Sequence, residues 1–209
     1  MRKETLANRI AAIKAAVPLT TAQAVLPSSA LLVKAFATQM QTPIEAIRDF
    51  DHEMEQLCSL HEDDHLFASL PGAGPVYPAR LTAAMGTDRD RWTTGDEVLC
   101  FSGVAPVLER RGKSSWLRWR YFGPKFLRQS FHEYAGESIA HSFWAKAYSM
   151  SQRARGKSHQ AAVRALAFKW IRIIYKCWKT RTPYSDVRYL ESLRTKRSPL
   201  WAYPANTPS

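Results

Sequence analysis

The 209-residue sequence has three cysteines, no long hydrophobic run and no glycine-rich phosphate loop. Cys58, Cys100 and Cys177 are too widely spaced for a disulfide framework or a metal-ligand cluster, so we expect reduced, buried thiols. No stretch approaches the roughly 20 apolar residues that cross a bilayer, and the start MRKETLANRI lacks the apolar core of a secretory signal. We therefore expect a cytoplasmic protein, associated with the nucleoid if it binds DNA.

Patterns typical of catalysis are also scarce. Loops of the Walker or dinucleotide-binding type are absent. The segment His61–His65 reads HEDDH, and its histidines lie four residues apart, but we interpret it as an acidic helix end and expect no metal there. Ser114 and Ser115 follow Lys113, yet no histidine or acid lies near enough in sequence to be named as their base.

Charge is plentiful but unevenly distributed. The sequence is 45% hydrophobic and 11% aromatic, which excludes disorder by composition, and its formal net charge is +12. Residues 1–64 carry −3, whereas residues 65–209 carry +15. A basic body of this kind favours nucleic acid as partner. An anionic membrane surface is a weaker interpretation. The third interpretation is that the charge only keeps the protein soluble.

The acidic N-terminal part has the periodicity of helices. Apolar residues from Leu6 to Val17 recur every three or four positions, and Pro18 should end this run. A second helix should begin near Ser28 or Ser29, which can cap it, and Pro43 should kink or break it near Thr42. Its apolar seam has coiled-coil spacing and predicts self-association, although it could also pack on the body; its members are Phe36, Met40, Ile47, Phe50, Met54 and Leu57.

A glycine-rich turn opens the basic body. The sequence Leu70-Pro71-Gly72-Ala73-Gly74 precedes a helix expected from about Tyr77 to Met85. Gly72 and Gly74 would let the backbone turn so that amide hydrogens form a nest for a phosphate oxygen. The pattern resembles the hairpin of a helix-hairpin-helix DNA-binding motif, and the alternative is an ordinary turn between two helices.

A basic run interleaved with aromatic residues follows between Glu109 and Arg128. We expect its cations to pair with phosphates, while Trp116 and Trp119 offer flat faces for stacking on bases, unless they are core. Leu117 to Tyr121 alternate in a way that predicts a strand. The cations of this run are Arg110, Arg111, Lys113, Arg118, Arg120, Lys125 and Arg128.

A long helix should follow Gly156, with Ser158 as its cap. Lys169, Arg172, Lys176 and Lys179 lie on one face at spacings of three, four and three. This stripe either binds phosphate or is only solvated, while the apolar face between Val163 and Cys177 should be core. The helix should end before Thr182-Pro183-Tyr184.

Four sequence blocks together cover residues 66–184: LFASLPGAGPVYPARL, SGVAPVLERRGK, KFLRQSFHEYA, and RARGKSHQAAVRALAFKWIRIIYKCW followed by RTPY. Because these blocks occur in this order, the chain resembles the rear half of transposases of the insertion-sequence 110/116/902 family. The resemblance implies a coiled-coil arm joined to a transposase domain with a nucleophilic serine. It also implies a front RuvC-like domain with magnesium-binding acids, DNA recombination by a multimer, and target choice guided by a structured RNA.

The sequence departs from that family pattern in two places. Nothing in it matches the RuvC-like domain or its acids, so we expect no cofactor in this chain. The family's serine falls at the position of Arg111, which has no hydroxyl; a shift onto Ser114 would lose the match at Gly112. The chain therefore looks like a truncated or decayed transposase that retains its nucleic-acid-binding half.

Taken together, the sequence predicts a mainly α fold with two short strands around residues 115–122. We expect a helical arm over residues 1–64, a transposase domain over 65–184 with a helix-hairpin-helix at 66–85, and a loosely ordered basic tail over 185–209. The predicted function is DNA binding in transposition without independent catalysis. Two alternatives are a regulatory binding module that co-assembles with intact transposase, and an unrelated helix-hairpin-helix binder.

Overall fold

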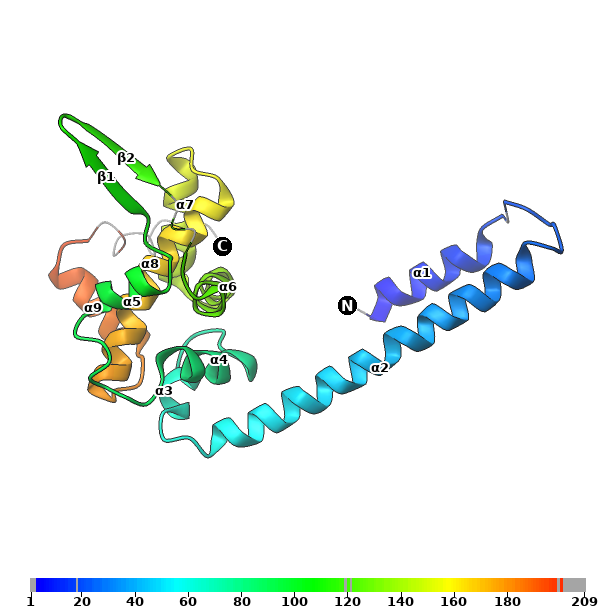
Figure 1. Ribbon diagram of the computed structural model, residues 1–209, viewed down its shortest axis with the longest axis horizontal. Helices are drawn as coiled ribbons and strands as arrows, with labels where there is room; N and C mark the ends of the chain where they lie inside the picture. The colour runs from blue at the N-terminus through cyan, green and yellow to red at the C-terminus, as the bar shows by residue number, and fades with distance from the viewer. Residues whose placement is uncertain (1–2, 18, 119, 121, 199, 201–209) are drawn as a thin grey trace. The chain divides into compact units, whose positions relative to one another are not determined.

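The computed structural model describes residues 3–17, 19–118, 120, 122–198 and 200, and it divides into two compact units, residues 1–50 and 51–209. The described residues form nine helices and one two-stranded antiparallel sheet (Figure 1). The fold is therefore mainly α, as the sequence predicted. Among the described residues, no helix is both long and apolar enough to span a membrane.

The N-terminal part contains helices α1 (Lys3–Ala15) and α2 (Leu26–Ser59). Helix α2 begins at Leu26, near the predicted start, but the predicted cap is wrong, because the Ser28 hydroxyl donates hydrogen bonds to the carbonyls of Ala24 and Val25 instead of accepting from amides. Of the kink or break predicted near Thr42, the break is wrong, because α2 continues through Pro43. This turn of the helix is exposed, so water can solvate the carbonyl that lacks its usual amide donor. Pro18 lies outside the described residues.

No described residue of α2 is buried. All six members of the apolar seam are exposed: Phe36, Met40, Ile47, Phe50, Met54 and Leu57.

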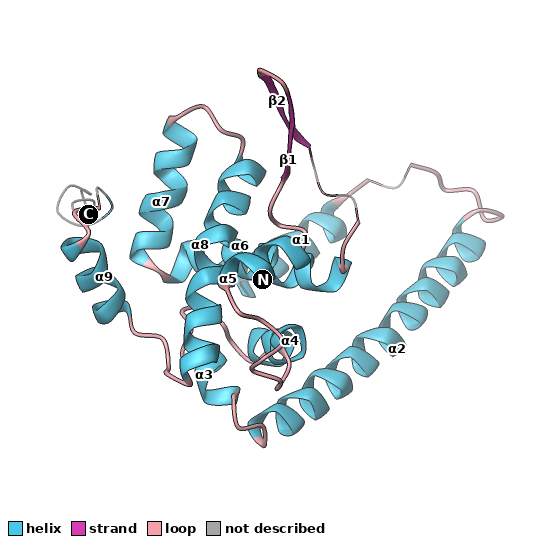
Figure 2. Cartoon of the chain, turned by 60° about the vertical axis from the view of Figure 1, so that its left-hand side comes forward, coloured by secondary structure: helices cyan, strands magenta, loops and turns pink. Residues whose placement is uncertain are grey.

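Helices α3 to α9 build the second unit (Figure 2). Their bounds are α3 (Asp64–Ala68), α4 (Val76–Met85), α5 (Gly95–Phe101), α6 (Lys125–His141), α7 (Phe143–Ala154), α8 (His159–Thr180) and α9 (Asp186–Thr195). Helix α8 is central, since it packs against α5, α6 and α7. Ser158 caps it as predicted, with its hydroxyl oxygen accepting from the amide of Ala161 at 3.3 Å.

An aromatic cluster forms much of this core. The ring of Trp170 on α8 lies 4.7 Å from that of Trp144 and 5.2 Å from that of Tyr134, and all three side chains are buried. Trp170 also donates its indole N–H to the hydroxyl of Ser138 at 2.7 Å, so its polar atom is satisfied. Such rings contribute large buried areas and favourable tilted or edge contacts, which makes this cluster a main source of stability.

The sheet is a β-hairpin of β1 (Val107–Arg111) and β2 (Ser114–Arg118), and it projects away from the helices in both views (Figures 1 and 2). Gly112 has a φ of +58° in the two-residue turn, a conformation that glycine adopts without steric cost. The predicted location around 115–122 was thus partly wrong: β1 was missed, and β2 ends at Arg118. Trp119 and Tyr121 lie outside the described residues.

Two further expectations need correction. Residues expected in a loose tail form α9, which begins after a cap at Ser185 and buries Leu193. The three cysteines are free thiols, but they are not buried: Cys100 is exposed, and Cys58 and Cys177 are half-buried.

Candidate nucleic-acid interface

The glycine turn lies between α3 and α4. Gly72 and Gly74 both have positive φ, +75° and +53°. A Cβ on Gly72 would lie 2.5 Å from Cδ2 of His141, whereas one on Gly74 would meet nothing within 4 Å. Gly72 is thus needed for close packing on α6, and Gly74 faces open space where an anion could approach.

The β-hairpin presents cations on its outer end. Arg110, Arg111 and Lys113 are exposed, and no ion pair joins them to another described residue. Ser114 is also exposed and lies directly across the hairpin from Arg111. The tip therefore offers guanidinium and ammonium groups that are not neutralised by acids of this part of the chain.

One face of the hairpin combines a cation with an aromatic ring. In the strand register Trp116 lies opposite Glu109, and Nε of Arg118 lies 3.0 Å from a carboxylate oxygen of Glu109. Both charged groups are exposed, so this pair contributes at most about 1 kcal/mol and can exchange for a phosphate contact. Trp116 is 49% exposed and is therefore not core, which leaves its indole face accessible for stacking.

Three other predicted cations lie where the hairpin joins α6. Arg128 donates from Nη1 to the carbonyl of Arg120 at 3.0 Å, and both side chains are half-buried near Gly103. These two arginines help to hold the end of the hairpin on the helical body. Lys125, the first residue of α6, is exposed.

The basic stripe of α8 is partly used inside the protein. Arg172 donates from Nε to Asp96 at 2.8 Å, and Lys179 lies 3.6 Å from Asp90. Lys169 is half-buried over the ring of Tyr148 at 4.9 Å. Lys176 alone among the four stripe cations is exposed without an ion pair to another described residue.

Sequence reasoning missed the contribution of α9. Arg188 and Lys196 lie beside Lys169, Arg172 and Lys176 along one cleft. The available signal was the spacing of Arg188, Ser192 and Lys196 at intervals of four, which places them on one helical face.

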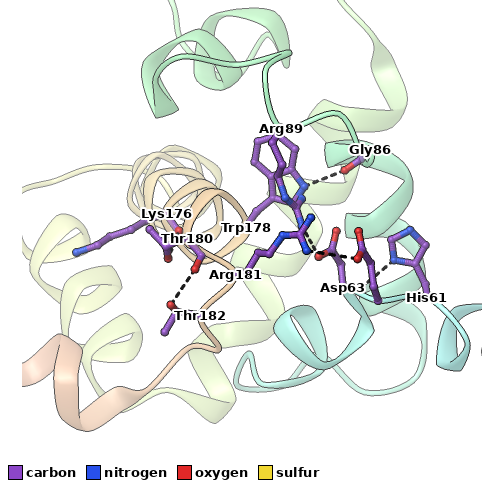
Figure 3. A network of polar contacts seen from close by, with 10 residues as sticks. His61, Asp63, Gly86, Arg89, Lys176, Trp178, Thr180, Arg181 and Thr182 are labelled. Carbon is purple, nitrogen blue, oxygen red and sulfur yellow. Dashed lines mark hydrogen bonds and ion pairs between the residues drawn. The ribbon is translucent and has the colours of Figure 1, made fainter.

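The segment around His61–His65 takes part in a network of polar contacts that joins it to Arg89 and the end of α8 (Figure 3). Asp63 is 2% exposed and forms an ion pair with Arg89, whose guanidinium also lies 4.5 Å from the ring of Trp178. His61 precedes α3, so it does not share a helical face with His65, and its Nδ1 accepts from the amide of Asp63 at 3.1 Å.

No group of three or more potential ligands that could hold a metal ion is found among the residues the structure describes.

Comparison with known proteins finds that this region is similar to transposases of insertion sequences. Residues 64–150 match the model of the Transposase IS116/IS110/IS902 family, which confirms the resemblance drawn from the sequence blocks. The match begins with α3 and includes the glycine turn, the β-hairpin and α6.

Curated relatives extend the similarity over most of the chain. The mini-circle protein for IS117 of Streptomyces coelicolor, whose name assigns it as a transposase, is 27% identical over 74% of this chain and 37% of its own length. A 42 kDa protein of insertion element IS900 from Mycobacterium paratuberculosis is 27% identical over 75% of this chain and 39% of its own. A 44.8 kDa protein of IS116 from Streptomyces clavuligerus is 27% identical over 83% and 44%. The chain thus spans about two fifths of the length of these relatives.

Proposed function

We propose that this chain binds DNA in the transposition of an insertion sequence, with the β-hairpin of residues 107–118 as its main contact surface. The observation that carries this proposal is the exposed hairpin tip, where Arg110, Arg111 and Lys113 have no acidic partner among the described residues. The hairpin also falls inside the segment that matches the transposase family.

The residues of the hairpin suit two kinds of contact. Arginine presents a planar fork of donors that matches phosphate oxygens, and lysine adds a point charge. Trp116 can stack on a base that is not covered by its neighbours, which favours single-stranded or distorted nucleic acid over regular duplex. Gly74, with its open approach and positive φ, supplies a second place for a phosphate near backbone amides.

A second candidate function is a regulatory module that binds nucleic acid without catalysis. Arg111 favours it, because the residue at the position of the family's serine has no hydroxyl with which to attack a phosphodiester. Such a module would bind the element's DNA or a structured guide RNA and could co-assemble with intact transposase. Either form would act in the cytoplasm, on nucleoid DNA.

We also infer that the arm brings copies of the chain together. Helix α2 carries coiled-coil spacing on a seam whose six members are all exposed. A second copy of the same helix offers the matching seam.

The test of DNA binding is a salt titration of the intact chain. If about six phosphates are contacted, the logarithm of the affinity should fall against the logarithm of salt concentration with a slope of roughly −4 to −5. Replacing Arg110 and Arg111 by glutamine should reduce the magnitude of this slope by about 0.7 to 0.9 for each lost contact. Fluorescence anisotropy of labelled element-end DNA measures both quantities.

The matched control replaces Lys146 and Lys157 by glutamine, since both are exposed lysines outside the hairpin. It removes the same net charge. A parental slope near zero contradicts DNA binding, and a hairpin variant equal to the control contradicts the hairpin as contact surface.

A further inference from the structure

A basic cleft of about 550 Å³ lies between α8 and the segment that leads into α9. Here it is called the α8–α9 cleft. Five of its lining residues are Lys or Arg, and none is Asp or Glu: Lys169, Arg172, Lys176, Arg188 and Lys196. Hydroxyl groups complete much of the polar lining, from Thr180, Thr182, Tyr184, Ser185, Tyr189 and Ser192.

Three of the five cations have no acidic partner within the described part of the chain. Lys176, Arg188 and Lys196 are exposed and form no ion pair with a described residue. Figure 3 shows Lys176 pointing away from the ion pair of Asp63 and Arg89, which lies on the other side of α8. These three groups are therefore available to a ligand in the cleft.

The charges in the cleft act on one another. Burial lowers the pKa of Lys169, and the positive charges of Arg172 and Lys196 lower it further. Like charges gathered in this way are unfavourable until an anion neutralises them. Arg172 is only partly compensated, since its ion pair with Asp96 is exposed to water.

We propose that the α8–α9 cleft binds the phosphodiester backbone of an unpaired nucleic-acid strand. Lysine, arginine and hydroxyl groups are the side chains that contact phosphate and sugar oxygens. The volume lies within the range of small-molecule sites, so the cleft accepts nucleotide units of one strand and not the width of a duplex. Tyr184 and Tyr189 add half-buried aromatic surface to its wall.

This inference rests on the proposed function, because it names the form of nucleic acid that a second surface of the same body recognises. Its residues lie on α8, on α9 and in the segments that flank α9, and they do not overlap the hairpin. The two surfaces can therefore be tested separately in the full chain.

The experiment compares two double variants of the full chain. Lys176→Gln with Arg188→Gln removes two uncompensated cations of the cleft, and Lys146→Gln with Lys157→Gln is the control of equal charge. The probes are a labelled oligothymidylate, the corresponding oligouridylate, a duplex, and inorganic pyrophosphate as competitor.

We expect the cleft variant to bind the single strands about tenfold or more weakly than the control does, because each charged hydrogen bond contributes appreciably to affinity. Its salt slope should shrink by about 1.4, from about 0.7 for each of two lost contacts on a single strand. Duplex affinity should change less. The DNA and RNA probes distinguish which backbone the cleft prefers.

Equal single-strand affinity of the cleft variant and the control overturns the inference, whereas a loss confined to the hairpin variant leaves the proposed function standing. Binding of pyrophosphate with no affinity for either strand also overturns it, and shows a site for free anions. Absence of all nucleic-acid binding contradicts the proposed function as well.

Cys177 gives an independent readout, because its side chain lines the cleft. Burial raises its pKa to about 11, so maleimide labelling of Cys177 at neutral pH should be slow. With Cys58 and Cys100 replaced by serine, saturating oligothymidylate should slow the labelling further, and this protection should be lost in the cleft variant. Unchanged labelling with bound oligonucleotide contradicts occupation of the cleft.

Discussion

Two tryptophans show how differently one residue type is used in this protein. Trp116 lies on β2 with half of its surface exposed, and no described aromatic ring contacts it. Trp170 is completely buried, contacts three other rings and donates a hydrogen bond to Ser138. The first side chain is available to a ligand, whereas the second holds the core together.

Replacing each tryptophan by alanine should separate binding from stability. Trp116→Ala should change the free energy of unfolding by no more than about 0.5 kcal/mol, as for other exposed positions, and weaken single-strand binding by about 1 to 3 kcal/mol. Trp170→Ala should lower the free energy of unfolding by about 3 to 5 kcal/mol, because it leaves a cavity and removes the indole donor to the Ser138 hydroxyl. Urea unfolding and anisotropy measure the two effects; a Trp116 variant that unfolds would show that this ring is structural.

At the scale of elements, the stability of α2 calls for an explanation. It is 34 residues long, and none of its described residues is buried. Isolated helices draw little stability from propensity alone, since most helices in proteins are stabilised by packing an apolar face. A partner for the seam would supply that packing.

Acidic substitutions in the seam should dissociate the protein. Ile47→Glu with Phe50→Glu places two charges on the seam, and the expected result is a monomer by light scattering. Gln41→Glu with Gln56→Glu adds the same charge on exposed positions away from the seam and should leave the oligomer intact. A monomeric parent, or identical masses for both variants, would contradict self-association through α2.

At the scale of the whole molecule, the charge favours nucleic-acid binding, whereas the residue at the expected nucleophile position does not favour strand cleavage. The net charge of +12 and the exposed hairpin favour polyanion binding. Arg111 stands where the family resemblance places a nucleophile, and the described residues provide no ligand set for a metal ion. Binding and strand cleavage should therefore separate in this chain.

Pure protein incubated with magnesium and element-end DNA should bind the DNA without cutting it. Denaturing gels of end-labelled strands measure this directly, with candidate guide RNA added in parallel. Magnesium-dependent cleavage that Ser114→Ala abolishes and Arg111→Ala preserves would show that Ser114, and not position 111, is the nucleophile.

Local patterns were enough to predict several elements of the fold. The cap at Ser158, the apolar face of α8 and the glycine turn before α4 all depend on residues within a few positions of one another. Prediction failed where the local signal was ambiguous. Pro43 breaks many helices, yet an exposed helix tolerates it, and the Gly112 turn with its first strand was not recognised.

The candidate sites depend more strongly on the tertiary structure. Nothing in the sequence distinguished the four regularly spaced cations of α8. In the structure, Arg172 forms an ion pair with Asp96 of α5, and Lys179 forms one with Asp90 of the loop before α5. The cleft exists only because the segment of residues 182–196 lies beside α8 and adds Arg188 and Lys196. No periodicity within one helix contains that information.

The sequence by itself thus determined the helical class, the basic character of the body and the similarity of residues 64–150 to a transposase family, because periodicity, charge and ordered motifs are properties of the chain. Only the tertiary structure decided that Trp116 is exposed while Trp170 is buried, and which cations remain without acidic partners. Burial and ion pairing are contacts between residues far apart in sequence, and their energies arise only when the chain has folded.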